Sequence, residues 1–198
     1  MNRPSSNSDS ELINQIRSEN TGAFETLIED YKKLVSHIIF RMVSNISDRE
    51  DICQDVFVKI YQNIGGFRFD SKLSTWIATI AHNTCINYLQ KKKIPLFADQ
   101  TPEGLTLENQ SSDEILPDTF VMENDISVQI KSEIEKLDIP YRTILTLYHL
   151  DEMSYAEISE IMNLPQGTVK SYLFRARKQL RKNLIISFQK EEIWDSNI

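Results

Sequence analysis

The sequence predicts an all-α protein of two helical bundles joined by a flexible acidic linker, with a helix-turn-helix in the second bundle. Apolar residues recur every three or four positions over most of the chain, which is the spacing of one helix face. Between residues 94 and 125 this periodicity stops, and the segment holds eight acidic residues, three prolines and no basic residue. Such a segment cannot bury enough apolar surface to fold, so the boundary between the bundles falls there.

The first bundle is expected over residues 10–93, behind a disordered leader at residues 1–9. A helix begins near Ser10, and a long amphipathic helix follows from Phe24 to Met42.

A third helix is marked by Ser47 and Glu50, which have the S-x-x-E spacing of a capping box. An apolar stripe follows, and four side chains lie off it: Asp51, Gln54, Asp55 and Val58. From spacing alone, these four side chains form an ordinary solvent-exposed face.

A loop with two aromatic rings and two cations comes next, over residues 65–72. The helix that follows, over residues 74–90, adds a third ring and two amides: Trp76, Asn83 and Asn87. Single-stranded nucleic acid needs rings to stack on, donors for base edges and charges for phosphates. Core packing of the rings would explain the same pattern, and spacing does not decide between the two interpretations.

The second bundle is expected over residues 126–185, followed by a short tail at residues 186–198. Another S-x-x-E capping box at Ser154 opens a short helix, and the turn Asn163 to Gly167 ends it. A further helix starts near Thr168. Two helices joined by a short glycine-containing turn form a helix-turn-helix, whose second helix enters the major groove of DNA.

That second helix separates into two faces. Val169, Leu173, Ala176 and Leu180 fall on the side that must face the core. Residues 168–182 include six basic residues and no acidic one, in a chain of net charge −7. Arg and Lys bridge guanine edges or neutralise phosphates, so the opposite face is a candidate DNA contact. A solvated surface helix would explain the charge alone, but not the cap, the turn and the apolar stripe together.

Composition excludes several classes of protein. The net negative charge comes from residues 94–125, so it carries little information about DNA binding. No apolar run is long enough to cross a membrane and the N-terminus is not a signal peptide, so a cytoplasmic protein is expected. Cys53 and Cys85 lie in apolar helical patterns, which indicates buried thiols rather than a disulfide or a metal site.

No feature of an enzyme is present in the sequence. There is no Walker-type phosphate loop, and no local motif pairs a nucleophile with a base. The three histidines, His37, His82 and His149, are far apart and lack metal-ligand spacing. We therefore expect neither a metal nor a cofactor.

Taken together, these segments resemble an extracytoplasmic-function (ECF) RNA polymerase sigma factor. Three segments resemble successive parts of the family's second sigma domain: AFETLIEDYKKLV, SDREDICQDVFVKIYQNI and FRFDSKLSTWIATIAHNTCINYL. The fourth sigma domain is resembled by LPQGTVKSYLFRARKQL. The resemblance covers about residues 11–93 and 126–184, with both domains in the family's order.

The resemblance implies a protein that binds core RNA polymerase, directs it to promoter DNA, helps to open the duplex, and is held inactive by an anti-sigma factor. The polymerase-binding positions would be Asp51, Gln54, Asp55 and Val58. The −10 element would be bound by Phe67, Arg68, Phe69, Lys72, Trp76, Asn83 and Asn87. The −35 element would be bound by Thr168, Lys170, Ser171, Phe174, Arg175 and Lys178.

Two residues depart from the family pattern. Phe69 stands where the family often has Gly, and Thr79 stands where it often has Arg. Both lie in the segments that the resemblance assigns to the −10 element. The resemblance also implies that the acidic linker passes through the nucleic-acid channels of the polymerase, where its eight carboxylates would mimic nucleic acid electrostatically.

One alternative from another class is a stand-alone helix-turn-helix regulator that binds duplex DNA without polymerase. Such a protein needs a dimer interface or a second basic surface. The sequence offers neither, and its near-neutral second bundle predicts weak unaided binding.

Overall fold

The computed structural model of the chain describes residues 7–18, 20–97 and 125–195. These residues form eight α-helices and one short 3-10 helix, and no strand occurs among them. The all-α prediction is confirmed for this part of the chain.

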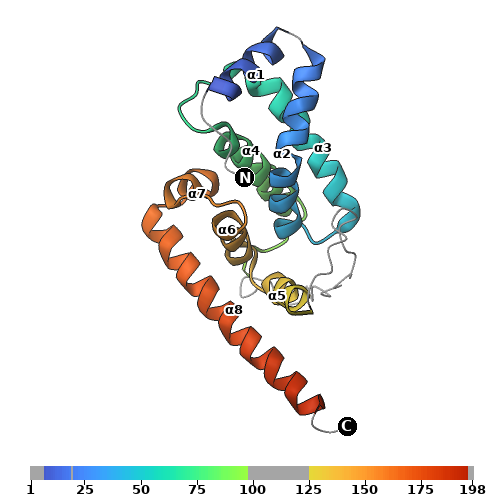
Figure 1. Cartoon of the computed structure of the whole chain (residues 1–198), viewed down its shortest axis with the longest axis vertical. Coiled ribbons are helices and arrows are strands. Elements are labelled where there is room, and N and C mark those ends of the chain that lie inside the picture. Colours follow the sequence, from blue (N-terminus) through green and yellow to red (C-terminus); the bar gives the residue numbers. More distant parts are fainter. Residues whose placement is uncertain (1–6, 19, 98–124, 196–198) are drawn as a thin grey trace.

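The first half of the molecule runs from blue to green in Figure 1. Its elements are α1 (Asn7–Arg17), α2 (Thr21–Met42), α3 (Ile46–Asn63), η1 (Ile64–Gly66) and α4 (Leu73–Lys91). The long helix α2 packs against α1, α3 and α4, and the periodic apolar residues meet between them. Because α1 begins at Asn7, residues 7–9 of the expected disordered leader are helical; residues 1–6 lie outside the described residues.

Asparagines cap the two helices that follow α1. The Asn20 side chain accepts a hydrogen bond from the Ala23 N–H at the start of α2. At α3 the Asn45 side chain accepts from the Ser47 N–H at 3.0 Å. The expected capping box at Ser47 is therefore wrong, because Asn45, a residue type strongly preferred at this position, starts the helix at Ile46.

The second half, yellow to red in Figure 1, consists of α5 (Asp125–Glu135), α6 (Ile139–His149), α7 (Tyr155–Met162) and α8 (Gln166–Asp195). The helix α8 is 30 residues long and extends well beyond the rest of the molecule. The separate tail expected from residue 186 is wrong as far as Asp195, because no Pro or Gly follows Gly167 to end the helix.

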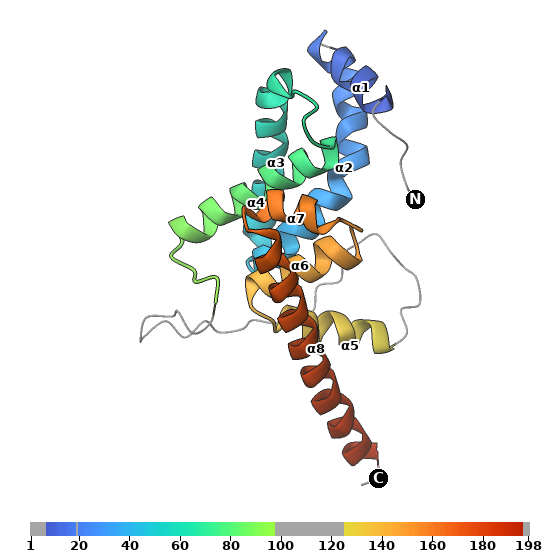
Figure 2. The same ribbon diagram turned by 90° about the vertical axis from the view of Figure 1, so that its left-hand side faces the viewer.

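The two halves pack against each other, α6 against α2 and α7 against α4 (Figure 2). Polar pairs that cross this contact are His37–Asp151 (2.9 Å), Arg41–Glu135 (3.1 Å) and Lys72–Glu157 (2.8 Å). Nearly all of the acidic segment expected to be a linker lies outside the described residues, which resume at Asp125 with α5.

Candidate nucleic-acid interface

The N-terminal half of α8 has the two faces that its sequence predicts. Val169, Leu173 and Ala176 are at most 1% exposed, so they fix the helix on the second bundle. Leu180, predicted on the same face, is half-buried and packs against this core. On the outer face Phe174 is 69% exposed, an unusual position for a large apolar ring. The cationic and polar side chains predicted to meet DNA are exposed as well: Lys170, Ser171, Arg175 and Lys178. Thr168 is half-buried at the start of the helix.

A capping box fixes the start of α7, the first helix of the helix-turn-helix. The Ser154 Oγ accepts from the Glu157 N–H, and the Glu157 carboxylate accepts from the Ser154 N–H at 2.8 Å, as predicted. The left-handed residue of the turn is Asn163, with φ 51° and ψ 47°. Gly167, expected in the turn, lies instead in the first turn of α8, since Pro165 precedes the helix.

The two aromatic rings of the loop between η1 and α4 lie close to Trp76 in the first turn of α4, and Phe67 contacts both of the others. The ring centroids of Phe69 and Phe67 are 4.9 Å apart, and those of Phe67 and Trp76 are 5.2 Å apart. Phe67 is 5% exposed, Trp76 is half-buried and Phe69 is 44% exposed. The two interpretations left open by spacing therefore divide between the rings: Phe67 belongs to the core, and Phe69 faces solvent.

Arg17 of α1 forms hydrogen bonds with the backbone at this loop. Its Nη2 donates to the carbonyl oxygens of Gly65 at 3.1 Å and Phe67 at 2.8 Å. No pattern in the sequence indicates this contact, because Arg17 is separated from the loop by about 50 residues and no motif joins them. The only available signal was that Arg17 is the one cation of its helix.

The remaining residues predicted to meet single-stranded DNA lie along α4 and at its start. Asn83 and Asn87 are exposed and, seven and eleven positions after Trp76, lie on the same face of the helix. Arg68 is exposed in the loop. The Lys72 Nζ lies 2.8 Å from the Glu157 carboxylate of the other half. Burial alone would raise the pKa of Glu157, but hydrogen bonds from Lys72 and Ser154 lower it below its ordinary value.

The outer face of α3 lies apart from the loop and from α8. Ile52, Val56 and Ile60 are buried, at most 5% exposed, so the predicted set Asp51, Gln54, Asp55 and Val58 faces solvent. Val58 is 53% exposed. The two carboxylates would repel the phosphates of DNA, so this face is not suited to nucleic acid.

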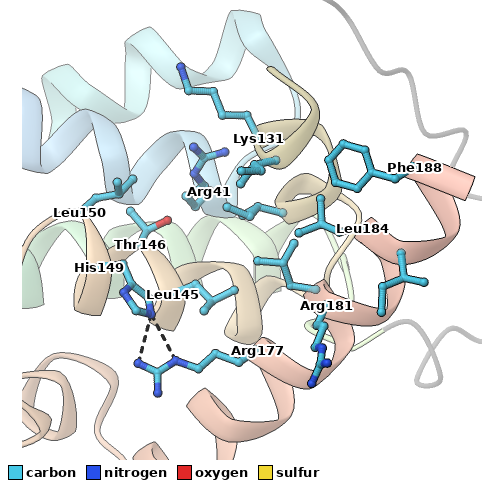
Figure 3. Close-up of a pocket in the computed structure, with 14 residues that line it drawn as sticks. Arg41, Lys131, Leu145, Thr146, His149, Leu150, Arg177, Arg181, Leu184 and Phe188 are labelled. Carbon is cyan, nitrogen blue, oxygen red and sulfur yellow. Dashed lines mark hydrogen bonds between the residues drawn. The ribbon is translucent and has the colours of Figure 1, made fainter. Parts of the chain in front are cut away.

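A groove of about 650 Å³ opens between α5, α6 and α8 (Figure 3). Its apolar lining includes Leu145, Leu150, Leu184 and Phe188. Cations border it, namely Arg41, Lys131, Arg177 and Arg181, and no acidic residue lines it. This combination suits an amphipathic segment with acidic residues. Sequence periodicity missed the groove, because it forms only where α8 passes α5 and α6.

Figure 3 also shows Arg177 donating to the His149 Nε2, with Nε at 3.2 Å. The Arg177 guanidinium lies over the Tyr148 ring, 5.0 Å from its centroid. Partial burial and the adjacent Arg177 charge lower the pKa of His149. Arg177 is thus engaged within the second half and is not available to DNA in this arrangement.

The thiols of Cys53 and Cys85 are free. Cys85 is fully buried and Cys53 is half-buried, and burial raises the pKa of both thiols, that of Cys85 to about 12. Within residues 7–18, 20–97 and 125–195, no group of three or more His, Cys, Asp or Glu side chains is arranged to hold a metal ion. Among the described helices, none has both the length and the apolar content needed to span a bilayer.

Comparison with known proteins gives two family matches. Residues 27–94 match the model of sigma-70 region 2, and residues 127–180 match that of sigma-70 region 4. The chain is 38% identical over 176 residues to the ECF RNA polymerase sigma factor SigW of Bacillus subtilis, which covers 87% of this chain and 94% of that relative. It is 31% identical over 180 residues to the RNA polymerase sigma-H factor of Pseudomonas aeruginosa, covering 89% of this chain and 93% of the relative.

Among solved structures, the fold is similar to that of the sigma factor RpoE in complex with the anti-sigma factor NepR from Bartonella quintana. The TM-score is 0.66, the identity is 23%, and the match covers 82% of this chain and 97% of that chain. At this identity the likeness concerns the fold alone.

Proposed function

The chain belongs to the ECF subfamily of RNA polymerase sigma factors, and on that premise we propose that it binds core RNA polymerase and directs it to two-part promoters. Family membership decides against the stand-alone helix-turn-helix regulator. We assign residues 10–93 to the second sigma domain and residues 126–185 to the fourth, with residues 94–125 as the linker.

The observation that carries the proposal is the presence of two unlike nucleic-acid surfaces in one chain. The first half has an exposed ring, exposed amides and cations around the loop, which suits unstacked bases. The second half has a regular helix with an exposed cationic face, which suits the major groove of a duplex. A promoter that is open at one element and double-stranded at the other requires both.

In this proposal the surface for the −10 element is formed by Phe67, Arg68, Phe69, Lys72, Trp76, Asn83 and Asn87, and all of them except the buried Phe67 contact the DNA. Phe67 acts as a support for the exposed Phe69 ring, since it is itself buried. The −35 element meets Thr168, Lys170, Ser171, Phe174, Arg175 and Lys178. Lys72 forms an ion pair with Glu157 here, so DNA binding at Lys72 would have to break this pair.

Polymerase binding is assigned to the α3 face formed by Asp51, Gln54, Asp55 and Val58. The groove of Figure 3, with its apolar lining and cationic border, is a second surface for a protein helix. An anti-sigma factor that covers such surfaces would keep the protein inactive. The chain itself catalyses no reaction in this proposal, because the polymerase does the chemistry, and it acts in the cytoplasm where polymerase and promoter meet.

The test is a pull-down of bacterial core RNA polymerase with the full chain, followed by transcription from a library of DNA fragments. We expect polymerase binding and transcripts that start downstream of a shared two-part motif. A D51N/D55N variant should bind polymerase more weakly, whereas Glu25→Gln, on the exposed side of α2, should not. Tight binding to duplex DNA without any binding to polymerase would contradict the proposal.

A further inference from the structure

The distal part of α8 extends beyond the rest of the molecule and leaves apolar side chains in solvent (Figure 1). Ile185 is 47% exposed and Phe188 is 36% exposed. Both line the groove between α5, α6 and α8, and so do Arg177, Arg181 and Leu184 of the same helix (Figure 3). An apolar groove along a helix is a surface on which a second amphipathic helix docks.

One stripe of α8 residues crosses this groove and continues beyond it. Its members are spaced alternately by four and three positions, which is the heptad spacing of helices that pair along their length: Arg177, Arg181, Leu184, Phe188, Glu191 and Asp195. The first four line the groove, and positions 191 and 195 continue the same line along the helix. The stripe is therefore cationic at one end, apolar in the middle and acidic at the other end.

The charges of this stripe have no opposite charge at the positions where one helix could supply it. Ion pairs within a helix join residues three or four positions apart. Around Arg181 those positions hold Arg177, Lys178, Leu184 and Ile185, and around Glu191 they hold Ser187, Phe188, Trp194 and Asp195. Like charges four positions apart, as at Arg177 and Arg181, destabilise an isolated helix. A partner with the reverse order of charges would remove this penalty.

A second copy of α8 that runs in the opposite direction has this reverse order. Three pairs then meet, each symmetrical about the level of Ile186: Leu184 with Phe188, Arg181 with Glu191, and Arg177 with Asp195. A two-fold axis repeats every pair in the other direction, so each contact forms twice. Arg177 already contacts His149 through Nε and Nη2, so the Arg181–Glu191 pairs carry more of the attraction.

The charge of the groove also favours the distal end of α8 as its occupant. Four cations border the groove and no acidic residue lines it: the cations are Arg41, Lys131, Arg177 and Arg181. From position 188 to position 195, α8 has three acidic residues and one lysine. In the antiparallel register this acidic end lies along the cationic border. Such complementarity fixes the register and the orientation of two partners.

We propose that the groove between α5, α6 and α8 receives the distal part of α8 from a second copy of this chain, in an antiparallel two-fold dimer. Leu184 and Phe188 form its apolar centre, and Arg181 and Glu191 form the ion pairs on either side. The dimer goes beyond the proposed function and does not depend on it. Because the second copy covers the groove, it excludes a helix of any other protein from this surface.

Sedimentation velocity of the full chain over a series of concentrations tests the dimer. The stripe is only about 28 Å long, so we expect the mass to rise with concentration, from the 23.0 kDa of one chain toward twice that value. Arg181→Glu and Glu191→Arg each place like charges opposite one another at two symmetrical positions, and each should weaken the dimer about 10-fold or more. Lys182→Glu makes the same charge change as Arg181→Glu at an exposed position off the stripe, and should leave the dimer unchanged.

Exchanging the two charges tests the orientation. The double variant R181E/E191R has opposite charges facing each other again in the antiparallel register, so it should dimerise like the wild type. A mixture of the two single variants should form mixed dimers for the same reason. In a parallel pair Arg181 would face Arg181, and the single variants would lose nothing.

Two results would overturn the proposal. One is a wild-type chain that keeps the mass of a single copy at every concentration, which would leave the groove to a helix of another protein. The other is a double variant that associates as weakly as the single variants although circular dichroism shows that all of them are folded.

Discussion

The loop from Gly65 to Lys72 and the N-terminal half of α8, the two surfaces proposed to meet DNA, are built in opposite ways. The loop has little regular structure, and its conformation depends on a left-handed Phe69 and on Arg17 from a distant helix. The surface of α8 needs no unusual backbone, because buried Val169 and Leu173 hold a regular helix in place. An unpaired base must be met by a shaped site, whereas a duplex already has a groove that accepts a helix.

The largest effect on stability is expected where α8 packs against the core of the second half. Leu173→Ala removes a side chain that is 1% exposed, and we expect a loss of about 2–5 kcal/mol in the free energy of unfolding. Its neighbour Phe174→Ala, 69% exposed, should change that free energy by roughly 0.5 kcal/mol or less. Denaturant titrations of the two variants make the comparison. Similar losses in both would mean that the outer face also contributes to folding.

Acid should destabilise the loop-bearing half through His82 of α4. Burial lowers the pKa of His82 to about 4, although a hydrogen bond with Asn83 opposes this shift. The unfolded chain, with an ordinary pKa near 6.5, then binds the proton more tightly, so stability falls as pH falls from about 6.5 to 4. Between pH 7 and pH 5 the loss should be about 2 kcal/mol. Thermal melts should show it, and a His82→Leu variant should show a flatter pH dependence.

The DNA-contacting side chains of α8 should act independently of the loop. Arg175→Ala should weaken holoenzyme binding to a duplex −35 fragment by roughly 1–3 kcal/mol. Binding of a single-stranded oligonucleotide with the −10 sequence found in the transcription experiment should be unchanged, because the loop lies in the other half. If Arg175 contacts a phosphate, the salt dependence of duplex binding should also become less steep. Equal loss on both DNAs would show that the two surfaces are not separable.

The smallest effect is expected at Asn163, the left-handed residue that follows α7. Asn163→Gly, at φ 51° after α7, should stabilise the protein by up to about 1 kcal/mol, since glycine adopts this conformation without steric cost. DNA binding should not change, because Asn163 serves only the turn. Chemical denaturation and duplex binding of the same preparation test both statements, and a loss of duplex binding would show that Asn163 does more than end the helix.

Sequence periodicity was sufficient for the parts of the molecule that are regular. The buried face of α8, the solvent-exposed face of α3 and the capping box at Ser154 all follow local spacing, and the structure confirms them. The errors at helix starts arose because residues that can begin a helix stand close together in the sequence, and spacing alone does not decide which one does so. Asn45 precedes the Ser47 motif and caps α3 first. Pro165 likewise ends the turn before Gly167, which lies in the first turn of α8 rather than in the turn where it was predicted.

The tertiary contacts that spacing could not predict join residues distant in the chain. Arg17 and the Phe67 carbonyl are separated by 50 positions, and His37 and Asp151 by 114. Such contacts depend on how the helices pack, which single-sequence periodicity does not encode. The groove of Figure 3 falls in this class, because residues of α5, α6 and α8 line it together.

The length of α8 has a mechanical consequence. At 1.5 Å per residue, its 30 residues form a rod of about 45 Å, with the proposed DNA-contacting face near one end (Figure 1). A change of about 10° in how that end lies in a DNA groove would move the opposite end by roughly 8 Å. The helix is thus a lever that enlarges small differences in docking angle, and a dye attached near Asp195 would report them by energy transfer.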